Sequence, residues 1–190
     1  AYFSSNPNLF PVINIAIQDA LDQGVVVIFG AGNTANHFDG SNGYVAFPAN
    51  ANIDELITVG ASDRNDEQSN YSPTSGKIDI SAPSHSAYDH RIEGEAFNIW
   101  TIDIPGDNGY NPWFSADWGL PAFNEIKPST GTNHLAYTGR MGGTSASTAE
   151  VAGVAALILS VNPDLPVHLV NDILYTTADK VGEYDYEWDI

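Results

Sequence analysis

Gly142-Gly143-Thr144-Ser145-Ala146-Ser147, followed at 148–159 by TAEVAGVAALIL, is the most informative segment of this chain. Two glycines and a group of small polar residues lead into a segment that is apolar almost all round, which predicts a helix buried inside a domain. The N-terminus of such a helix has free backbone N–H groups and favours negative charge, so a serine there suits nucleophilic catalysis beside an oxyanion site. An equally weighted alternative is an N-cap, in which Thr144 or Ser145 only satisfies the first turn.

Within this turn, Ser145 is the preferred candidate nucleophile. Ser147 lies two positions later, about 200° round a helix, and should face away from the cleft of Ser145. Thr144 is less accessible because of its methyl group. The hydroxyl of Ser145 is a poor nucleophile until a general base takes its proton.

Three ordered motifs resemble those of the subtilisin-like serine proteases. Gly143–Ser147 with Val151-Ala152-Gly153 resembles the nucleophile motif, and 24–33 (GVVVIFGAGN) resembles the strand that leads to the oxyanion-hole asparagine, here Asn33. Residues 56–62 and 78–83 look like the two strands between them. The resemblance implies an α/β fold with a mostly parallel sheet flanked by helices, and a serine endopeptidase. The loop at 99–111, with Gly142, is similar to bacterial kexin-like members.

The motifs that carry the catalytic Asp and His in that family, Asp-Ser/Thr-Gly and His-Gly-Thr, do not occur in this sequence. The chain has five histidines: His37, His85, His90, His134 and His168. We therefore expect residues 1–190 to be the C-terminal part of an incomplete subtilisin-like domain, inactive alone. The acid and the base would come from an N-terminal half of the same domain. A long insertion is expected at about 84–141, rich in Gly, Pro and aromatic residues.

Hydrophobic periodicity predicts a helix over about 9–21 that Gly24 ends. It also predicts a strand buried on both faces at 25–29 and further strands at 56–61 and 78–82. A last helix should run from near Pro166 to about Ala178. These elements fit the α/β arrangement that the resemblance implies.

The resemblance implies that the oxyanion strand and the loop after it form one wall of the substrate pocket. Its expected substrate-binding residues are Ala31, Gly32, Asp39, Asn42 and Thr144. Kexin-like relatives prefer basic side chains and carry an acidic residue where this chain has Asn42. Cleavage after basic residues and cleavage after large apolar residues therefore remain equal alternatives. The family's proline four residues after the nucleophile is alanine here, Ala149.

Two other functions stay open at this point. The chain could be a catalytically silent relative that binds a peptide or a protein. More remotely, Gly30-x-Gly32-x-x-Ala35 after an apolar strand matches a dinucleotide fingerprint of an oxidoreductase. A dinucleotide-binding site requires that a helix begins at these glycines.

The amino-acid composition argues against some classes of binding partner. Six Lys and Arg against 24 Asp and Glu give a net charge of −18, which argues against nucleic acid. We expect no apolar run long enough to span a membrane. The absence of cysteine removes disulfides and thiolate metal sites. No cofactor is required for the expected chemistry. Calcium is common in the family as a structural ion, but Asp63, Asp66 and Glu67 resemble ligands only in composition. The resemblance implies a secreted bacterial protein.

Overall fold

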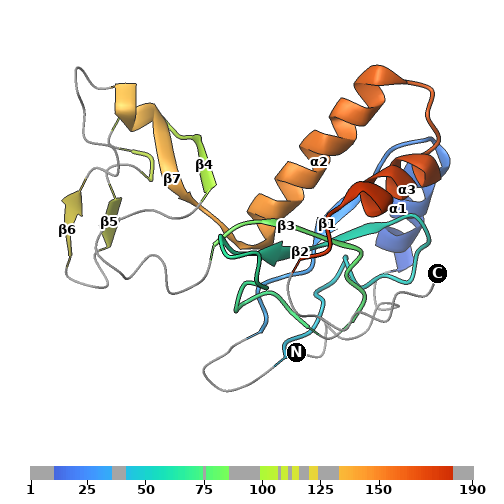
Figure 1. Ribbon diagram of the computed structural model, residues 1–190, viewed down its shortest axis with the longest axis horizontal. Helices are drawn as coiled ribbons and strands as arrows, with labels where there is room; N and C mark the ends of the chain where they lie inside the picture. Colours follow the sequence, from blue (N-terminus) through green and yellow to red (C-terminus); the bar gives the residue numbers. More distant parts are fainter. Residues whose placement is uncertain are drawn as a thin grey trace.

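A three-stranded parallel sheet is the centre of the fold (Figure 1). The computed structural model describes residues 11–35, 42–74, 76–85, 99–106, 108–110, 113–115, 120–123 and 133–181. The sheet has the order β1-β2-β3, formed by Ile28–Gly30, Ile57–Ser62 and Ile80–Pro83. In its register, Gly30 lies opposite Val59, and Val59 lies opposite Ile80. All six residues of β2 are buried, as expected for a central parallel strand.

Three helices flank this sheet: α1 (Pro11–Asp22), α2 (Gly143–Val161) and α3 (Val167–Thr177). One core cluster joins β2 and β3 to α2 and α3. A second joins α1 to Leu56 and Val167, with Phe29 of β1 packed against it. The predicted α/β class with a parallel sheet flanked by helices is confirmed. Gly24 has φ +80 and its N–H bonds the carbonyl of Leu21 at 2.8 Å, so it ends α1 as predicted.

Helix α3 is hydrogen-bonded to the loop before β2. Pro166 is the residue that caps α3, one position before the helical residues. The side chain of Asn171, which is buried, donates a hydrogen bond of 2.9 Å to the carbonyl of Glu55. Glu55 has φ +67, a backbone conformation that this bond helps to hold. This contact fixes α3 against the amino end of β2.

Strand β1 is shorter and more exposed than the sequence predicts. The prediction placed a doubly buried strand at 25–29, whereas the structure has three half-buried residues at Ile28–Gly30. Val25 is 52% exposed. The reason is tertiary: within the described residues, β1 pairs with β2 along one edge and with no strand along the other.

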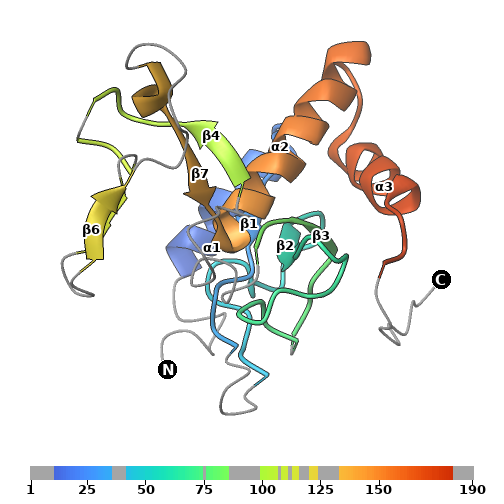
Figure 2. The same ribbon diagram turned by 60° about the vertical axis from the view of Figure 1, so that its left-hand side comes forward.

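Residues 84–142 contain more regular structure than a loop. The structure gives β4 (Ile99–Ile102), β5 (Trp113–Ser115), β6 (Leu120–Phe123), the 3-10 helix η3 (Asn133–Ala136) and β7 (Tyr137–Met141). β4 pairs antiparallel with β7, and β5 with β6. Figures 1 and 2 show these strands to one side of the parallel sheet, with β7 running directly into α2. Their status as an insertion stays a prediction.

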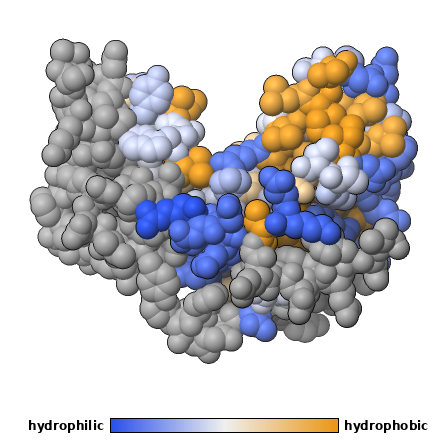
Figure 3. All heavy atoms as spheres, viewed as in Figure 1, coloured by the Kyte–Doolittle hydropathy of each residue, from blue (hydrophilic) through white to orange (hydrophobic). Residues whose placement is uncertain are grey.

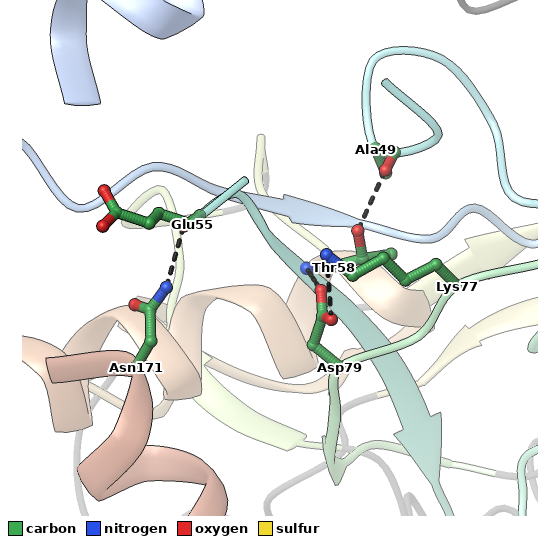
Figure 4. A network of polar contacts seen from close by, with 6 residues as sticks. All are labelled: Ala49, Glu55, Thr58, Lys77, Asp79 and Asn171. Carbon is green, nitrogen blue, oxygen red and sulfur yellow. Dashed lines mark hydrogen bonds and ion pairs between the residues drawn. The ribbon is translucent and has the colours of Figure 1, made fainter. Parts of the chain in front are cut away.

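A polar network fastens β2 to its neighbours (Figure 4). The backbone N–H of Thr58 donates to a carboxylate oxygen of Asp79 at 2.8 Å, and the N–H of Asp79 donates to the Thr58 carbonyl at 2.9 Å. The hydroxyl of Thr58, which is buried, donates to the carbonyl of Ala49 at 2.9 Å. Lys77 lies 3.3 Å from the other Asp79 oxygen. The Asp79 carboxylate is therefore stabilised by one backbone hydrogen bond and one ion pair.

Helix α2 is apolar on its buried side and on part of its exposed side. Val151 and Ala155 are buried in the core, whereas Val154, Leu157 and Val161 are exposed. Figure 3 shows the resulting hydrophobic patch over α2. The 19-residue helix has a mean hydropathy of 1.4, long and apolar enough by these measures to cross a membrane, so the expectation that no such run exists is wrong. Because the helix packs on all three strands, we interpret it as a core helix.

Candidate active site

The glycine pair before Ser145 is required by its surroundings. Gly142 is extended, with φ −166, but a Cβ there would overlap the imidazole ring of His85. Gly143 has φ +76, which favours glycine, and a Cβ there would lie 2.7 Å from the amide nitrogen of Asn33. The chain can therefore turn from β7 into α2 only with two residues that lack side chains.

Thr144 joins the first turn of α2 to the end of β1. Its backbone N–H donates to the side-chain oxygen of Asn33 at 3.0 Å, and its hydroxyl lies 3.2 Å from the same oxygen. The N–H of Gly32 donates to the Thr144 hydroxyl at 3.1 Å. Thr144 is buried, and its side chain and its backbone N–H both serve these contacts. The structure thus brings Asn33 to the turn that carries Ser145.

The hydroxyls of this turn point in different directions. Ser145 is exposed, whereas Ser147 is fully buried and donates to the carbonyl of Ala82 at 2.8 Å. The prediction that Ser147 faces away from the surface of Ser145 is confirmed. Thr148 bonds back to the carbonyl of Thr144 at 2.6 Å. One turn further, partial burial raises the pKa of Glu150 above its ordinary value.

Gly30 allows the sheet to approach α2 closely. A Cβ on Gly30 would lie 2.9 Å from the hydroxyl of Thr148 and 3.0 Å from that of Thr144. Residues 31–35, which follow, form no helix. A dinucleotide fingerprint needs a helix N-terminus at this point to hold the pyrophosphate. The described geometry therefore gives no support to the oxidoreductase alternative, and the glycine has a packing role instead.

The other predicted substrate-binding residues lie along the loop after β1. Ala31 is fully buried, and its N–H and carbonyl are both bonded to neighbouring backbone. Gly32 is half-buried with φ +100. Asn42 is exposed, and its carbonyl accepts hydrogen bonds from the N–H and hydroxyl of Thr74 at 2.8 and 3.2 Å. Asp39 lies outside the described residues. Their contacts with substrate stay a prediction.

A polar cluster beside Gly143 was missed by the sequence reasoning. Ser84 donates a hydrogen bond of 3.1 Å to the Gly143 carbonyl, and Tyr71 donates one of 2.7 Å to Ser84. The rings of Tyr71 and His85 lie 5.2 Å apart. The available signal was the polar pair Ser84-His85 directly after a parallel strand, because the carboxyl ends of such strands collect functional side chains.

The acidic turn after β2 is closed by its own backbone. One carboxylate oxygen of Asp63 accepts hydrogen bonds from the N–H groups of Asn65 and Glu67, at 2.8 and 3.3 Å. In the part of the chain that the structure describes, no group of three or more His, Asp or Glu side chains could hold a metal ion. No calcium site is therefore assigned to the described residues.

Comparison with known proteins identifies the class to which this site belongs. The model of the subtilase family, peptidase S8, matches residues 3–187, so the chain belongs to the subtilase family. A calcium-dependent protease of Nostoc sp. is 32% identical over 169 residues, which are 87% of this chain and 22% of that protein. Subtilisin DY of Bacillus licheniformis is 28% identical over 171 residues, 90% of this chain and 46% of that protein.

Solved structures agree on the fold. The crystal structure of a serine protease of Aeromonas sobria matches with a TM-score of 0.69 and 24% identity, over 94% of this chain and 32% of that one. A cold-adapted subtilisin-like serine proteinase matches with a TM-score of 0.57 and 23% identity, over 91% and 46%. The chain thus spans less than half the length of the relatives named here.

Proposed function

We propose that this chain is the nucleophile-bearing part of a subtilisin-like serine endopeptidase, in which Ser145 attacks the carbonyl carbon of a peptide bond. The observation that supports this role is the contrast within one turn. Thr144 and Ser147 are buried and hydrogen-bonded, whereas Ser145 is exposed at the N-terminus of a 19-residue helix. The positive end of the helix dipole favours the negative charge that develops beside Ser145.

Asn33 is proposed to stabilise the tetrahedral intermediate. Its side-chain oxygen accepts hydrogen bonds from the N–H and the hydroxyl of Thr144. The amide nitrogen of the same side chain lies beside Gly143. The oxyanion would receive hydrogen bonds from this nitrogen and from the backbone N–H of Ser145. Replacing Asn33 by Ala should lower kcat by about 10²–10³ with KM little changed, the magnitude measured for such a donor in subtilisin.

The general base and its acid are proposed to lie on another part of the subtilase domain. His168 lies 3.9 Å from Glu55, but this pair is at the amino end of β2. Asn33 and the turn of Ser145 are at the opposite, carboxyl end of the strands. The exposed apolar residues of α1 and α2 offer a surface for such a part: Val12, Ile15, Val154, Leu157 and Val161.

The remaining features of the proposal come from the family. We propose peptide or protein substrates and secretion. One relative is named an extracellular serine protease of Aeromonas sobria. The relative from Nostoc sp. and another from Trichormus variabilis are named calcium-dependent proteases, so calcium is proposed as a structural ion. Chelation with EGTA should then lower the thermal midpoint of the full-length protein, and an unchanged midpoint would contradict it.

The test is active-site labelling of the full-length protein with a fluorophosphonate, together with hydrolysis of a peptide library. We expect the label on Ser145, found by peptide mass mapping, and loss of both labelling and hydrolysis in Ser145→Ala. The control is Ser160→Ala, an exposed serine at the other end of α2, which should keep full activity. Hydrolysis that survives Ser145→Ala would refute the proposal.

The same experiment separates the proposed enzyme from a silent binding module. A protein that binds peptides but takes no label would support the binding module. Residues 1–190 alone should not hydrolyse peptides at rates normal for a protease, because the proposed general base is absent. Hydrolysis by this chain alone that Ser145→Ala abolishes would mean that one of its own histidines is the base.

A further inference from the structure

We propose that Ser84, oriented by Tyr71, is a positioning residue for the turn that carries Ser145; this inference rests on the proposed function of Ser145. Ser84 follows β3 directly and is buried. Its hydroxyl donates a hydrogen bond of 3.1 Å to the carbonyl of Gly143 across 59 positions of sequence. Ser84 therefore reaches the nucleophile turn from a different strand than Asn33 does.

The peptide group between Gly143 and Thr144 is held at both of its polar ends. Its carbonyl accepts the hydrogen bond from Ser84, and its N–H donates to the side-chain oxygen of Asn33 at 3.0 Å. Ser145 is attached to the next peptide group, so the orientation of this plane sets the direction of the Ser145 backbone. The same plane holds the carboxamide of Asn33 in place.

Such fixation is needed because two consecutive glycines precede the nucleophile. Glycine has the largest conformational freedom of any residue, so without outside contacts the turn would sample several orientations. An oxyanion site depends on donors that are held in place before the reaction. The hydrogen bonds from Ser84 and to Asn33 supply this restraint from opposite ends of one peptide plane.

Tyr71 fixes the direction of the Ser84 hydroxyl. Ser84 has one proton, which it gives to the Gly143 carbonyl, and its oxygen accepts the Tyr71 hydroxyl at 2.7 Å. The ring of Tyr71 packs on that of His85, which in turn occupies the space beside Gly142. His85 Nδ1 also contacts both hydroxyl oxygens, at the long distance of 3.5 Å.

The inference is tested by steady-state kinetics of the full-length protein with Ser84→Ala, Ser84→Thr, Tyr71→Phe and the double variant Tyr71→Phe/Ser84→Ala. We expect Ser84→Ala to lower kcat about tenfold at unchanged KM, as for the loss of one buried hydrogen bond. Ser84→Thr, which keeps the hydroxyl, should recover most of this loss. Because Tyr71 acts through Ser84, the double variant should be no slower than Ser84→Ala.

The matched control is Ser81→Ala, which removes an exposed hydroxyl from the same strand and should leave kcat unchanged. If Ser84→Ala does not fold, Tyr71→Phe decides, since it keeps the ring and removes only the hydroxyl; it should lower kcat at unchanged KM. Wild-type kcat in Ser84→Ala, a change in KM alone, or additive losses in the double variant would overturn the inference.

Fluorophosphonate labelling distinguishes failure of the role inferred for Ser84 from failure of the function proposed for Ser145. A wild type that takes no fluorophosphonate at Ser145 overturns the proposed function, and the inference with it. A wild type that is labelled at Ser145, with Ser84→Ala labelled equally fast, overturns the inference alone.

Discussion

Substituting Gly143 by Ala should lower the unfolding free energy more than the same substitution at Gly24. The two glycines have nearly the same backbone conformation, with φ +76 and φ +80. They differ in what a new methyl group would meet. At Gly24 no atom lies within 4 Å, whereas at Gly143 the Cβ would lie 2.7 Å from the amide nitrogen of Asn33. Gly24→Ala is therefore a control for backbone strain alone.

The magnitudes follow from these contacts. An L-residue in this left-handed conformation costs about 1–2 kcal/mol, which should be the whole effect at Gly24. At Gly143 the methyl group must also displace Asn33 and weaken its two hydrogen bonds from Thr144. At about 1 kcal/mol for each bond, Gly143→Ala should lose roughly 3–4 kcal/mol of unfolding free energy.

Urea denaturation of the two full-length variants measures this difference, and fluorophosphonate labelling measures its consequence at Ser145. Gly143→Ala should unfold at a lower urea concentration than Gly24→Ala and should label far more slowly. Equal urea midpoints for the two variants would show that the contact between residue 143 and Asn33 contributes nothing to the free energy of unfolding. Normal labelling of Gly143→Ala would show that Asn33 need not be held in this position.

Two further predictions concern stability. Val59→Ala should lower the unfolding free energy by roughly 2–3 kcal/mol, because Val59 is fully buried in the core. Val25→Ala, at a half-exposed position, should change the unfolding free energy little. Urea denaturation of the two variants measures both effects. Burial raises the pKa of Glu150 above its ordinary 4.5, so its ionised form opposes folding. Glu150→Gln should therefore be more stable than wild type at pH 7. The advantage should fade as the pH falls through the raised pKa and should be gone below about pH 4.5; an advantage that grows in acid would contradict this.

Several elements were predictable because their signals are local. The helix at Gly143–Val161 follows from an apolar run that is long and contains no proline, and the end of α1 follows from Gly24. The opposite orientations of Ser145 and Ser147 follow from the 100° step of a helix. The subtilase family was recognisable from three ordered motifs. The strands within 84–142 were not, because they are only three to five residues long, and β4 pairs with β7, which lies far away in the sequence.

Contiguous motifs in the chain already specify the class of fold, the candidate nucleophile and the candidate oxyanion donor. The contacts that hold the turn before Ser145 become visible only in the folded chain. Ser84 and Asn33 follow different strands, and their bonds to the Gly143–Thr144 peptide cross 59 and 111 positions of sequence. No local pattern encodes such contacts, because they exist only when β1 and β3 lie in one sheet and α2 packs across it.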